Sequence, residues 1–388
     1  MFKCQPGYTL RKIKDISYLL PYGQQIADQK KGFVLNETST FLWNVLQHNE
    51  GAEPQQLMEM LARTYHLDET YFPELLTDVT DFLTQLTAMG MITEDLHLTA
   101  SAPFASMIIA GICMRLYGPA ELISENFRPF YHDFQDDDTS QEIELITTPP
   151  PSRCYGQVLL QNSEMTIFEN SDRYIVLFPQ MQNLYEVHML KDGTYVRIYC
   201  HPQASPLNIE NLFHAIRLFF LFTAQKNGLF AIHSASVLYR GKAWLFSGHS
   251  GMGKSTHTAL WHELFSVPYL NGDLNLLGLQ EGRIIAYGIP WCGTSEIFTT
   301  EQYELGGIVL LGRDPHTDYL EELTPSEKVL RVMQRMISPA WKERQLSENL
   351  FFAEEIADHV PVLYLLCTKN ASAACTIKDV IDRLEDSQ

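Results

Sequence analysis

Residues 243–256 read AWLFSGHSGMGKST, an apolar run that passes directly into a glycine-rich segment. The glycine-rich part fits the pattern G-x-x-x-x-G-K-[ST] from Gly248 to Ser255. The run before it has the composition of a buried strand, and residues 256–265 have helical spacing. A glycine-rich loop that joins a strand to a helix N-terminus can bind phosphate groups. We therefore predict an α/β core with a phosphate-binding loop; a glycine-rich turn before an ordinary helix is the alternative.

Each residue type in this loop has a chemical task. Glycines let backbone amides turn inward around phosphate oxygens, Lys254 reaches the β- and γ-phosphates, and the Ser255 hydroxyl ligates Mg²⁺. The sequence therefore predicts that the protein binds ATP or GTP together with Mg²⁺. The residues expected to contact the nucleotide are Gly248, Ser250, Gly251, Met252, Gly253, Lys254, Ser255 and Thr256.

A carboxylate is expected near the metal, and Asp273 follows soon after the predicted helix. In a strand–loop–helix–strand unit, this interval brings the second strand back beside the first, so we expect Asp273 near the γ-phosphate. Asn275, two positions further, lies on the same strand face and is predicted to support the metal. The alternative is that Asn271 and Gly272 only form a hairpin turn.

A histidine lies on the strand that precedes the loop strand. Residues 232–238 are followed by the short segment 239–242 and then by the loop strand, which predicts a hairpin. His233 would then be level with the loop end of the neighbouring strand, within reach of the carboxylate or the attacking hydroxyl. A histidine with a purely structural role is the alternative.

The composition excludes several classes of protein. The 388 residues include 28 Lys and Arg against 47 Asp and Glu, a net charge of −19, which disfavours nucleic-acid binding. Seven cysteines without a C-x-x-C spacing predict neither a disulfide framework nor a zinc cluster. No apolar run is long enough to span a membrane, and the N-terminus lacks the pattern of a secretion signal. We therefore expect a cytoplasmic protein of two or three domains.

The first predicted domain, residues 1–97, is a small sheet with three helices. Short apolar runs separated by turn residues predict the strands, and Asn36 is a typical helix N-cap. Helical spacing then recurs up to Gly90, which ends the last helix. The predicted strands cover residues 8–13, 17–21 and 32–35, and the predicted helices cover residues 36–46, 54–65 and 74–89.

Two further domains complete the predicted fold class, α/β with α+β. Residues 102–205 form a β-rich intermediate domain, in which the acidic run 136–138 is expected to be a solvated loop. Residues 206–388 form the nucleotide-binding core. The clearest strand signals in the intermediate domain are at residues 106–112, 157–160, 174–178 and 195–199, and the core begins with an apolar helix at residues 208–225.

The strand at His233, the glycine-rich loop and the aspartate after it resemble the catalytic core of the HPr kinase/phosphorylase-like family, which shares its nucleotide site with the phosphoenolpyruvate carboxykinases. The resemblance covers roughly residues 230–384. It implies a P-loop kinase in which Lys254 and Asp273 are catalytic and His233 assists. HPr kinases carry two adjacent aspartates, and the first of these positions is Gly272 here. Asp273 then combines the metal and base duties, or another residue assists.

The segment 288–296 resembles the Gly-x-Pro-Trp-x-Gly segment of HPr-kinase-like proteins found beside peptide-modification genes. HPr itself is therefore not the expected substrate. Cys292, Thr294 and Ser295 in this segment are candidates to line the acceptor pocket, with Cys292 as a packed thiol rather than a nucleophile.

Residues 32–43, 61–65 and 78–86 are similar to PqqD-like domains. These are small winged-helix modules that capture the leader segment of a ribosomally made peptide by adding it as a strand beside their own sheet. The resemblance implies that residues 1–97 bind the leader of a precursor peptide. A DNA-binding winged helix, the alternative, conflicts with the acidic composition.

These features together predict a Mg²⁺-dependent kinase that transfers the γ-phosphoryl group of ATP or GTP to a Ser or Thr hydroxyl of a precursor peptide captured by its N-terminal domain. Two alternatives stay open: a small-molecule kinase, and a peptide-binding chaperone that its nucleotide switches between conformations. The sequence leaves the oligomeric state open, a homo-oligomer included.

Overall fold

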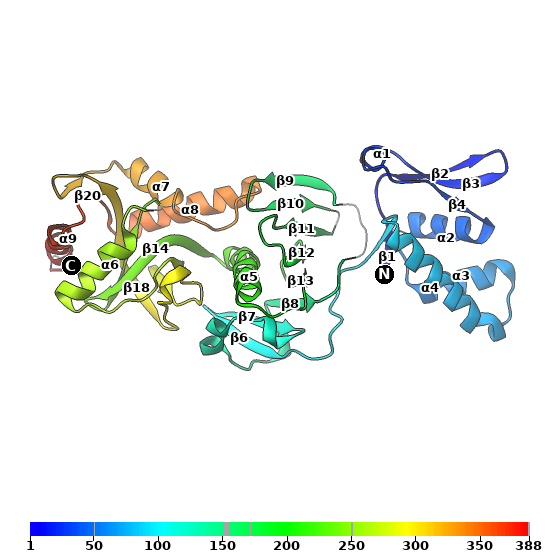
Figure 1. The fold of residues 1–388 in the computed structure, drawn as a ribbon, viewed down its shortest axis with the longest axis horizontal. Coiled ribbons are helices and arrows are strands. Elements are labelled where there is room, and N and C mark those ends of the chain that lie inside the picture. Colours follow the sequence, from blue (N-terminus) through cyan, green and yellow to red (C-terminus); the bar gives the residue numbers. More distant parts are fainter. Residues whose placement is uncertain (50, 151–154, 171, 250, 387–388) are drawn as a thin grey trace.

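The structure is a computed structural model that describes the chain except residues 50, 151–154, 171, 250 and 387–388. The described residues form four sheets, of two, three, eight and seven strands. The fold is therefore of mixed α/β type, as predicted. Figure 1 shows that an N-terminal module, the eight-stranded sheet and the seven-stranded sheet follow one another along the longest axis of the molecule.

The N-terminal module, residues 2–94, confirms the predicted sheet and three helices. Its three-stranded sheet has the order β2-β3-β4, which leaves β4 at an edge, and Asn36 caps α2 by accepting a hydrogen bond from the Ser39 amide at 2.8 Å. The short helix α1 and the pair β1–β5, which joins the two ends of the module, were not predicted. The elements are β1 (Phe2–Cys4), β2 (Tyr8–Ile13), β3 (Ile16–Pro21), α1 (Gln24–Ala27), β4 (Phe33–Leu35), α2 (Glu37–His48), α3 (Pro54–Tyr65), α4 (Phe72–Ala88) and β5 (Ile92–Glu94).

The eight-stranded sheet has the order β6-β7-β8-β13-β12-β11-β10-β9, so β6 and β9 are its edges. The single run expected at residues 106–112 is wrong: Ala110 and Gly111 have φ angles of 51° and 78° and form a tight hairpin. The acidic run is an exposed turn, Asp136–Asp138. The strands are β6 (Ala105–Ile109), β7 (Ile112–Tyr117), β8 (Gln141–Ile146), β9 (Gln157–Gln161), β10 (Thr166–Glu169), β11 (Arg173–Leu177), β12 (Leu184–Leu190) and β13 (Tyr195–Cys200).

A polar network fixes the segment between the module and this sheet. The buried carboxylate of Glu144 accepts hydrogen bonds from the backbone amides of Thr99 and Ala100, at 3.1 and 2.8 Å. Arg197 donates to Glu144 at 3.2 Å, and Arg173 on β11 donates to the carbonyl of Glu94 at 2.8 Å. Because these bonds join the end of the module to buried groups of the sheet, the two parts are held together by more than the chain itself.

Helix α5 (Pro206–Lys226) begins with Ser205 as its N-cap and lies between the two large sheets (Figure 1). Apolar side chains occur all around it, as expected of a buried helix. Phe219 and Phe220 on α5 belong to one core cluster that contains Val196 of the eight-stranded sheet and Leu276 of the seven-stranded sheet. The two sheets therefore share a core across α5. No helix in the described part of the chain is long and apolar enough to span a bilayer.

The seven-stranded sheet has the order β15-β14-β16-β17-β18-β20-β19, and β15 also pairs with β18. The expectation that the strand after the loop helix returns beside the loop strand is wrong. The β14–β15 hairpin and the parallel strand β18 occupy the two edges of β15, so β16 pairs with β14 instead. The elements are β14 (Leu229–Tyr239), β15 (Lys242–Ser247), α6 (Lys254–Phe265), β16 (Leu274–Gln280), β17 (Arg283–Tyr287), β18 (Gln302–Arg313), β19 (Tyr319–Glu321), α7 (Pro325–Met333), α8 (Glu343–His359), β20 (Val362–Cys367) and α9 (Ala371–Glu385).

Candidate active site

The glycine-rich loop joins β15 to α6, the strand-to-helix arrangement that the sequence predicted. Gly251 and Gly253 have φ angles of 76° and 96°, a region that favours glycine, and Gly253 is the N-cap of α6. Lys254 is the first residue of the helix and is buried. Ser250, which the sequence placed among the nucleotide contacts, lies outside the described residues.

Two arginines that the sequence analysis did not select hold this loop. Arg313, at the end of β18, donates a hydrogen bond to the carbonyl of Gly251 at 3.0 Å. The guanidinium of Arg335, just after α7, lies 3.0 Å from Nδ1 of His249, and its buried Nε has no hydrogen-bond partner among the described atoms. Both arginines come from elements far along the chain from the loop, so only the fold brings them to it.

Asp273 and His233 form a pair, with His233 in the middle of β14 and Asp273 just before β16. Nδ1 of His233 lies 3.3 Å from Oδ1 of Asp273, and the Ser234 amide donates to the Asp273 carbonyl at 3.0 Å. The carbonyl of His233 accepts a hydrogen bond from the Ser247 hydroxyl at 2.6 Å. The predicted hairpin therefore brings His233 level with the loop end of β15, and Asp273 lies beside it even though β16 is one strand further away than expected.

The charges around this pair set its protonation states. Burial lowers the pKa of His233; Asp273 opposes that effect, while Lys254 and Arg217 add to it. Burial also lowers the pKa of Lys254, with Arg335 adding to the effect and Asp273 opposing it. Since the ordinary pKa of histidine is about 6.5, His233 is neutral at pH 7. A neutral imidazole has one N–H donor and one nitrogen with a lone pair, so His233 can donate one hydrogen bond and accept another.

The segment after β17 packs against Asp273. A Cβ placed on Gly293, whose φ is 62°, would lie 2.8 Å from the Asp273 Cβ, so glycine permits this close approach. The Ser295 hydroxyl donates to the Cys292 carbonyl at 2.7 Å, and burial raises the pKa of the Cys292 thiol. The structure therefore brings Ser295 and Cys292 to the site, with Cys292 as a packed thiol, while Thr294 is exposed.

Trp291 anchors this segment to α5. Its ring nitrogen donates to the carbonyl of Phe213 at 2.8 Å, and its ring lies within 6 Å of the rings of Phe127, Phe213 and Phe220. Phe127 belongs to the region of the eight-stranded sheet. The segment that packs against Asp273 is thus held in place by the core that the two large sheets share.

Asn275 has a different place from the one predicted. Its side-chain amide donates to the carbonyl and the hydroxyl of Ser234, at 2.7 and 2.9 Å, and its oxygen accepts from the Ser236 hydroxyl at 2.7 Å. The side chain is buried, and its amide nitrogen and oxygen both make hydrogen bonds that join β14 to β16. We therefore leave Asn275 out of the proposed metal site.

The residues of the loop fit a nucleotide with Mg²⁺. The side chains of Ser255 and Thr256 are exposed in the first turn of α6, and in the described part of the chain no hydrogen bond occupies either hydroxyl. Lys254 and the unpaired Nε of Arg335 supply positive charge and a free donor beside the loop. The described residues contain no cluster of three or more His, Cys, Asp or Glu side chains that would bind a metal alone, so a metal here would need the phosphates as ligands.

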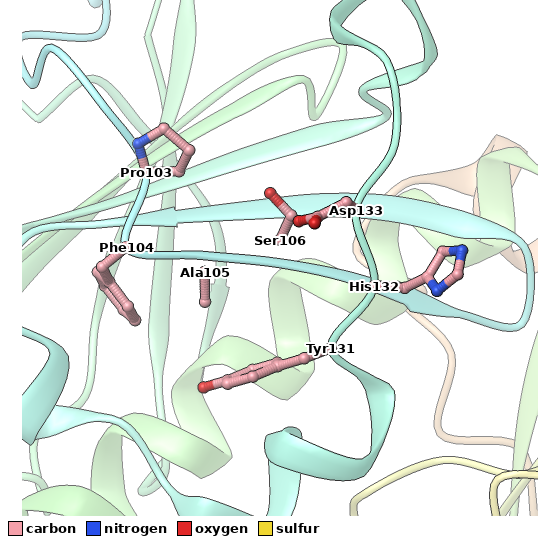
Figure 2. Close-up of a pocket in the computed structure, with 7 residues that line it drawn as sticks. All are labelled: Pro103, Phe104, Ala105, Ser106, Tyr131, His132 and Asp133. Carbon is pink, nitrogen blue, oxygen red and sulfur yellow. The ribbon is translucent and has the colours of Figure 1, made fainter.

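A separate pocket of about 600 Å³ lies along the edge strand β6 of the eight-stranded sheet. Ser106, His132 and Asp133 line it, the residue types of a hydrolytic triad. In Figure 2 the His132 ring points away from the other two side chains. The His132 amide donates to the Ser106 carbonyl at 3.0 Å, but within the described structure no side-chain hydrogen bond joins the three residues. This pocket is therefore not a second catalytic site of that kind.

Comparisons with known proteins find matches to part of the chain. Residues 25–92 match the family model described as Coenzyme PQQ synthesis protein D (PqqD), so the N-terminal module is PqqD-like. No curated protein matches the chain. Among solved structures 47 chains match, including the Hpr(Ser) kinase/phosphatase from Coxiella burnetii, which is 12% identical, with a TM-score of 0.25, and covers 40% of this chain and 95% of its own.

Proposed function

We propose that the protein is a Mg²⁺-dependent kinase that transfers the γ-phosphoryl group of ATP or GTP to a Ser or Thr hydroxyl of a ribosomally made precursor peptide. The observation that carries the proposal is the Asp273–His233 pair beside Lys254 at the start of the loop helix. A carboxylate, a neutral histidine and a lysine at a glycine-rich phosphate loop are the groups that phosphoryl transfer to a hydroxyl requires.

Each side chain has a role in this proposal. The Asp273 carboxylate orients the acceptor hydroxyl and takes its proton, and His233, which is neutral, holds that carboxylate through Nδ1. Lys254 and the loop amides stabilise the charge that develops on the transferred group. When bound, Mg²⁺ would neutralise phosphate charge, with Ser255 and Asp273 as its protein ligands.

The PqqD-like module supports a peptide acceptor. A groove of about 510 Å³ runs beside the edge strand β4, between it and helices α2 and α4. Val34 of β4 is 55% exposed, and Phe82 of α4 lines the same groove. An extended peptide could pair with β4 and place alternate side chains in the groove. We propose that the leader of the precursor binds there and raises the concentration of the acceptor near Asp273.

The test is mass spectrometry of the precursor peptide encoded nearest to this gene, after incubation with ATP, GTP and Mg²⁺. We expect a phosphopeptide with the wild-type protein and none with Lys254→Ala, whose folding is checked by circular dichroism. An unmodified peptide with wild-type protein that binds nucleotide would contradict the kinase proposal and favour a nucleotide-switched chaperone. Phosphorylation of small hydroxyl compounds alone would favour a small-molecule kinase.

A further inference from the structure

Helix α5 presents two basic side chains to a pocket near Asp273. His214 and Arg217 lie about one turn apart on α5 and line a pocket of about 490 Å³. The Phe213 carbonyl, next to His214, accepts a hydrogen bond from the Trp291 ring at 2.8 Å, so this part of α5 faces the segment that packs against Asp273. In agreement, the Asp273 carboxylate opposes the lowering of the pKa that burial causes in both side chains. Ile337 also lines the pocket, and its amide donates to the carbonyl of Ala231 on β14 at 2.9 Å. His233 lies two residues after Ala231 on the same strand.

Arg217 has no partner in this pocket. Its guanidinium is largely buried, and among the described residues it has no hydrogen bond or ion pair. Burial lowers its pKa, but a guanidinium stays charged in a protein. Glu164 lines the pocket from an exposed turn and makes no ion pair with Arg217, while Asp273 is already paired with His233. A buried cation is costly unless an anion contacts it, and neither carboxylate makes a direct ion pair with the Arg217 guanidinium in the described structure.

His214 adds a second unsatisfied donor or acceptor. Its Nε2 lies 3.8 Å from Glu210, but its Nδ1 is buried and has no hydrogen-bond partner among the described atoms. Apolar side chains, those of Met165, Met181 and Leu218, form much of the remaining wall. Apolar walls exclude water and so strengthen a charged hydrogen bond formed between them.

We propose, on the basis of the kinase function above, that this pocket binds a carboxylate next to the acceptor hydroxyl. Arg217 holds it with the two parallel N–H bonds that a guanidinium makes to a carboxylate, and the Nδ1 of His214 supplies a further bond. The acceptor is then a Ser or Thr flanked by an acidic residue. Arg217 is a residue that determines specificity, because it contacts the substrate beside the reacting hydroxyl and takes no part in the bond changes.

The experiment measures binding of blocked tetrapeptides in the presence of Mg²⁺ and a non-hydrolysable ATP analogue, by titration calorimetry at millimolar concentration. The probes are acetyl-Gly-Ser-Asp-Gly-amide, the same peptide with Asn for Asp, and that Asn peptide with phosphoserine. We expect the wild-type protein to bind the Asp peptide roughly tenfold more tightly than the Asn peptide. Arg217→Gln should bring this ratio close to one.

Two further variants keep the test sharp. Lys226→Gln removes one positive charge from the far end of the same helix, where Lys226 is exposed and bonds to the carbonyl of Asp192, and it should leave the ratio unchanged. Arg217→Lys keeps the charge but not the planar fork, so it should reduce the ratio less than Arg217→Gln. Thermal unfolding shows whether each variant folds. If Arg217→Gln does not fold, Arg217→Lys tests the inference, because it must still lower the preference for the Asp peptide over the Asn peptide.

Three results would overturn the inference: equal binding of the Asp and Asn peptides by the wild-type protein, a preference that survives in Arg217→Gln, or Arg217-dependent binding of only the phosphoserine peptide. Failure of the kinase proposal has a different signature. If the Arg217-dependent preference is present but no phosphopeptide forms with ATP, the pocket is as inferred and the kinase proposal is wrong. If ATP phosphorylates the Asp and Asn peptides with equal kcat/KM, the kinase proposal stands and the pocket inference fails.

Discussion

The Ser295 hydroxyl fills the place where a side chain on Gly272 would begin: a Cβ at Gly272 would lie only 1.8 Å from that oxygen. Ser295 is held there by its hydrogen bond to the Cys292 carbonyl, at 2.7 Å. Because residue 272 is glycine, the segment that carries Ser295 can pack directly against the chain next to Asp273.

Gly272→Asp should therefore destabilise the core. The new side chain would displace Ser295, and overpacking of this kind costs about 1–3 kcal/mol of unfolding free energy. Urea denaturation of Gly272→Asp, of Ser295→Gly and of the double variant measures the effect. The double variant should recover part of the loss, because Ser295→Gly removes the clashing hydroxyl. A fully stable single variant would contradict this packing.

Asp273→Asn should lower the rate of phosphoryl transfer by about 10²–10⁴-fold, the usual contribution of a general base. Affinity for the nucleotide without Mg²⁺ should change little, because Lys254 and the loop amides remain. His233→Asn should have a smaller effect, since His233 acts through Asp273. The double variant should be no slower than Asp273→Asn alone if the pair acts as a unit. Additive losses in single-turnover rates would mean that the two residues act independently.

The His233 pKa should lie below the ordinary histidine value. Burial disfavours the imidazolium more than Asp273 favours it, so protonation requires a pH below about 6.5. The acid limb of kcat/KM should appear only below that pH. The pH dependence of the NMR signals of the His233 ring measures this pKa directly. The signals are assigned by their loss in His233→Asn. Asp273→Asn should lower it further, because the charge that favours the imidazolium is lost; an increase would contradict the geometry of the pair.

The parts that the sequence predicted well depend on residues close together in the chain. The glycine-rich loop, its strand and its helix are one continuous segment, and the two turns with positive φ at Gly251 and Gly253 need glycine. The β14–β15 hairpin is also local. It placed His233 correctly, because the turn fixes the register between the two strands.

The parts that the sequence did not predict depend on long-range contacts. Arg313 and Arg335 reach the loop only because β18 is parallel to β15 and because the Arg335 carbonyl accepts the His233 amide, at 2.9 Å. The spacing between Ser255 and Asp273 does not show that β14 lies between β15 and β16. Likewise, a run of apolar residues cannot reveal the turn at Ala110, because alanine rarely adopts a positive φ.

Val34→Asp should weaken binding of the precursor peptide without unfolding the module. Val34 is 55% exposed at the edge strand that borders the groove, so the charge enters the proposed leader site and not the core. Ile13→Asp is the matched control, because Ile13 is 51% exposed on the same sheet and does not line the groove. We expect KM for the precursor to rise about tenfold or more in Val34→Asp only, if the leader makes most of the contacts.

A point substitution is preferable here to deletion of residues 1–97. Such a deletion would remove the Glu94 carbonyl from the buried Arg173 and the His97 carbonyl from Arg197, and so would disturb the eight-stranded sheet. Equal KM values for Val34→Asp and Ile13→Asp would show that the leader does not use the β4 edge.

His257 should make the protein less stable as the pH falls from 6.5 to 4. It lies in α6 among buried side chains, and neither ring nitrogen has a hydrogen-bond partner among the described atoms. Burial lowers its pKa from 6.5 to about 4. Above pH 6.5 neither the folded nor the unfolded state binds a proton at this ring, so it causes no pH dependence. Between pH 6.5 and pH 4 the His257 ring binds a proton in the unfolded state but not in the folded state, which favours unfolding.

The resulting loss of unfolding free energy is about 3 kcal/mol by pH 4, since each pKa unit is worth about 1.4 kcal/mol. His257→Leu removes the titrating ring. Between pH 6.5 and pH 4 its unfolding free energy should therefore fall by about 3 kcal/mol less than that of the wild type. Other groups titrate equally in both proteins, and the difference between their urea denaturation curves isolates His257. His132→Leu, at an exposed histidine, is the control. If the stability of both variants depends on pH as that of the wild type does, His257 takes up its proton in the folded state. The ring is then not buried without a hydrogen-bond partner.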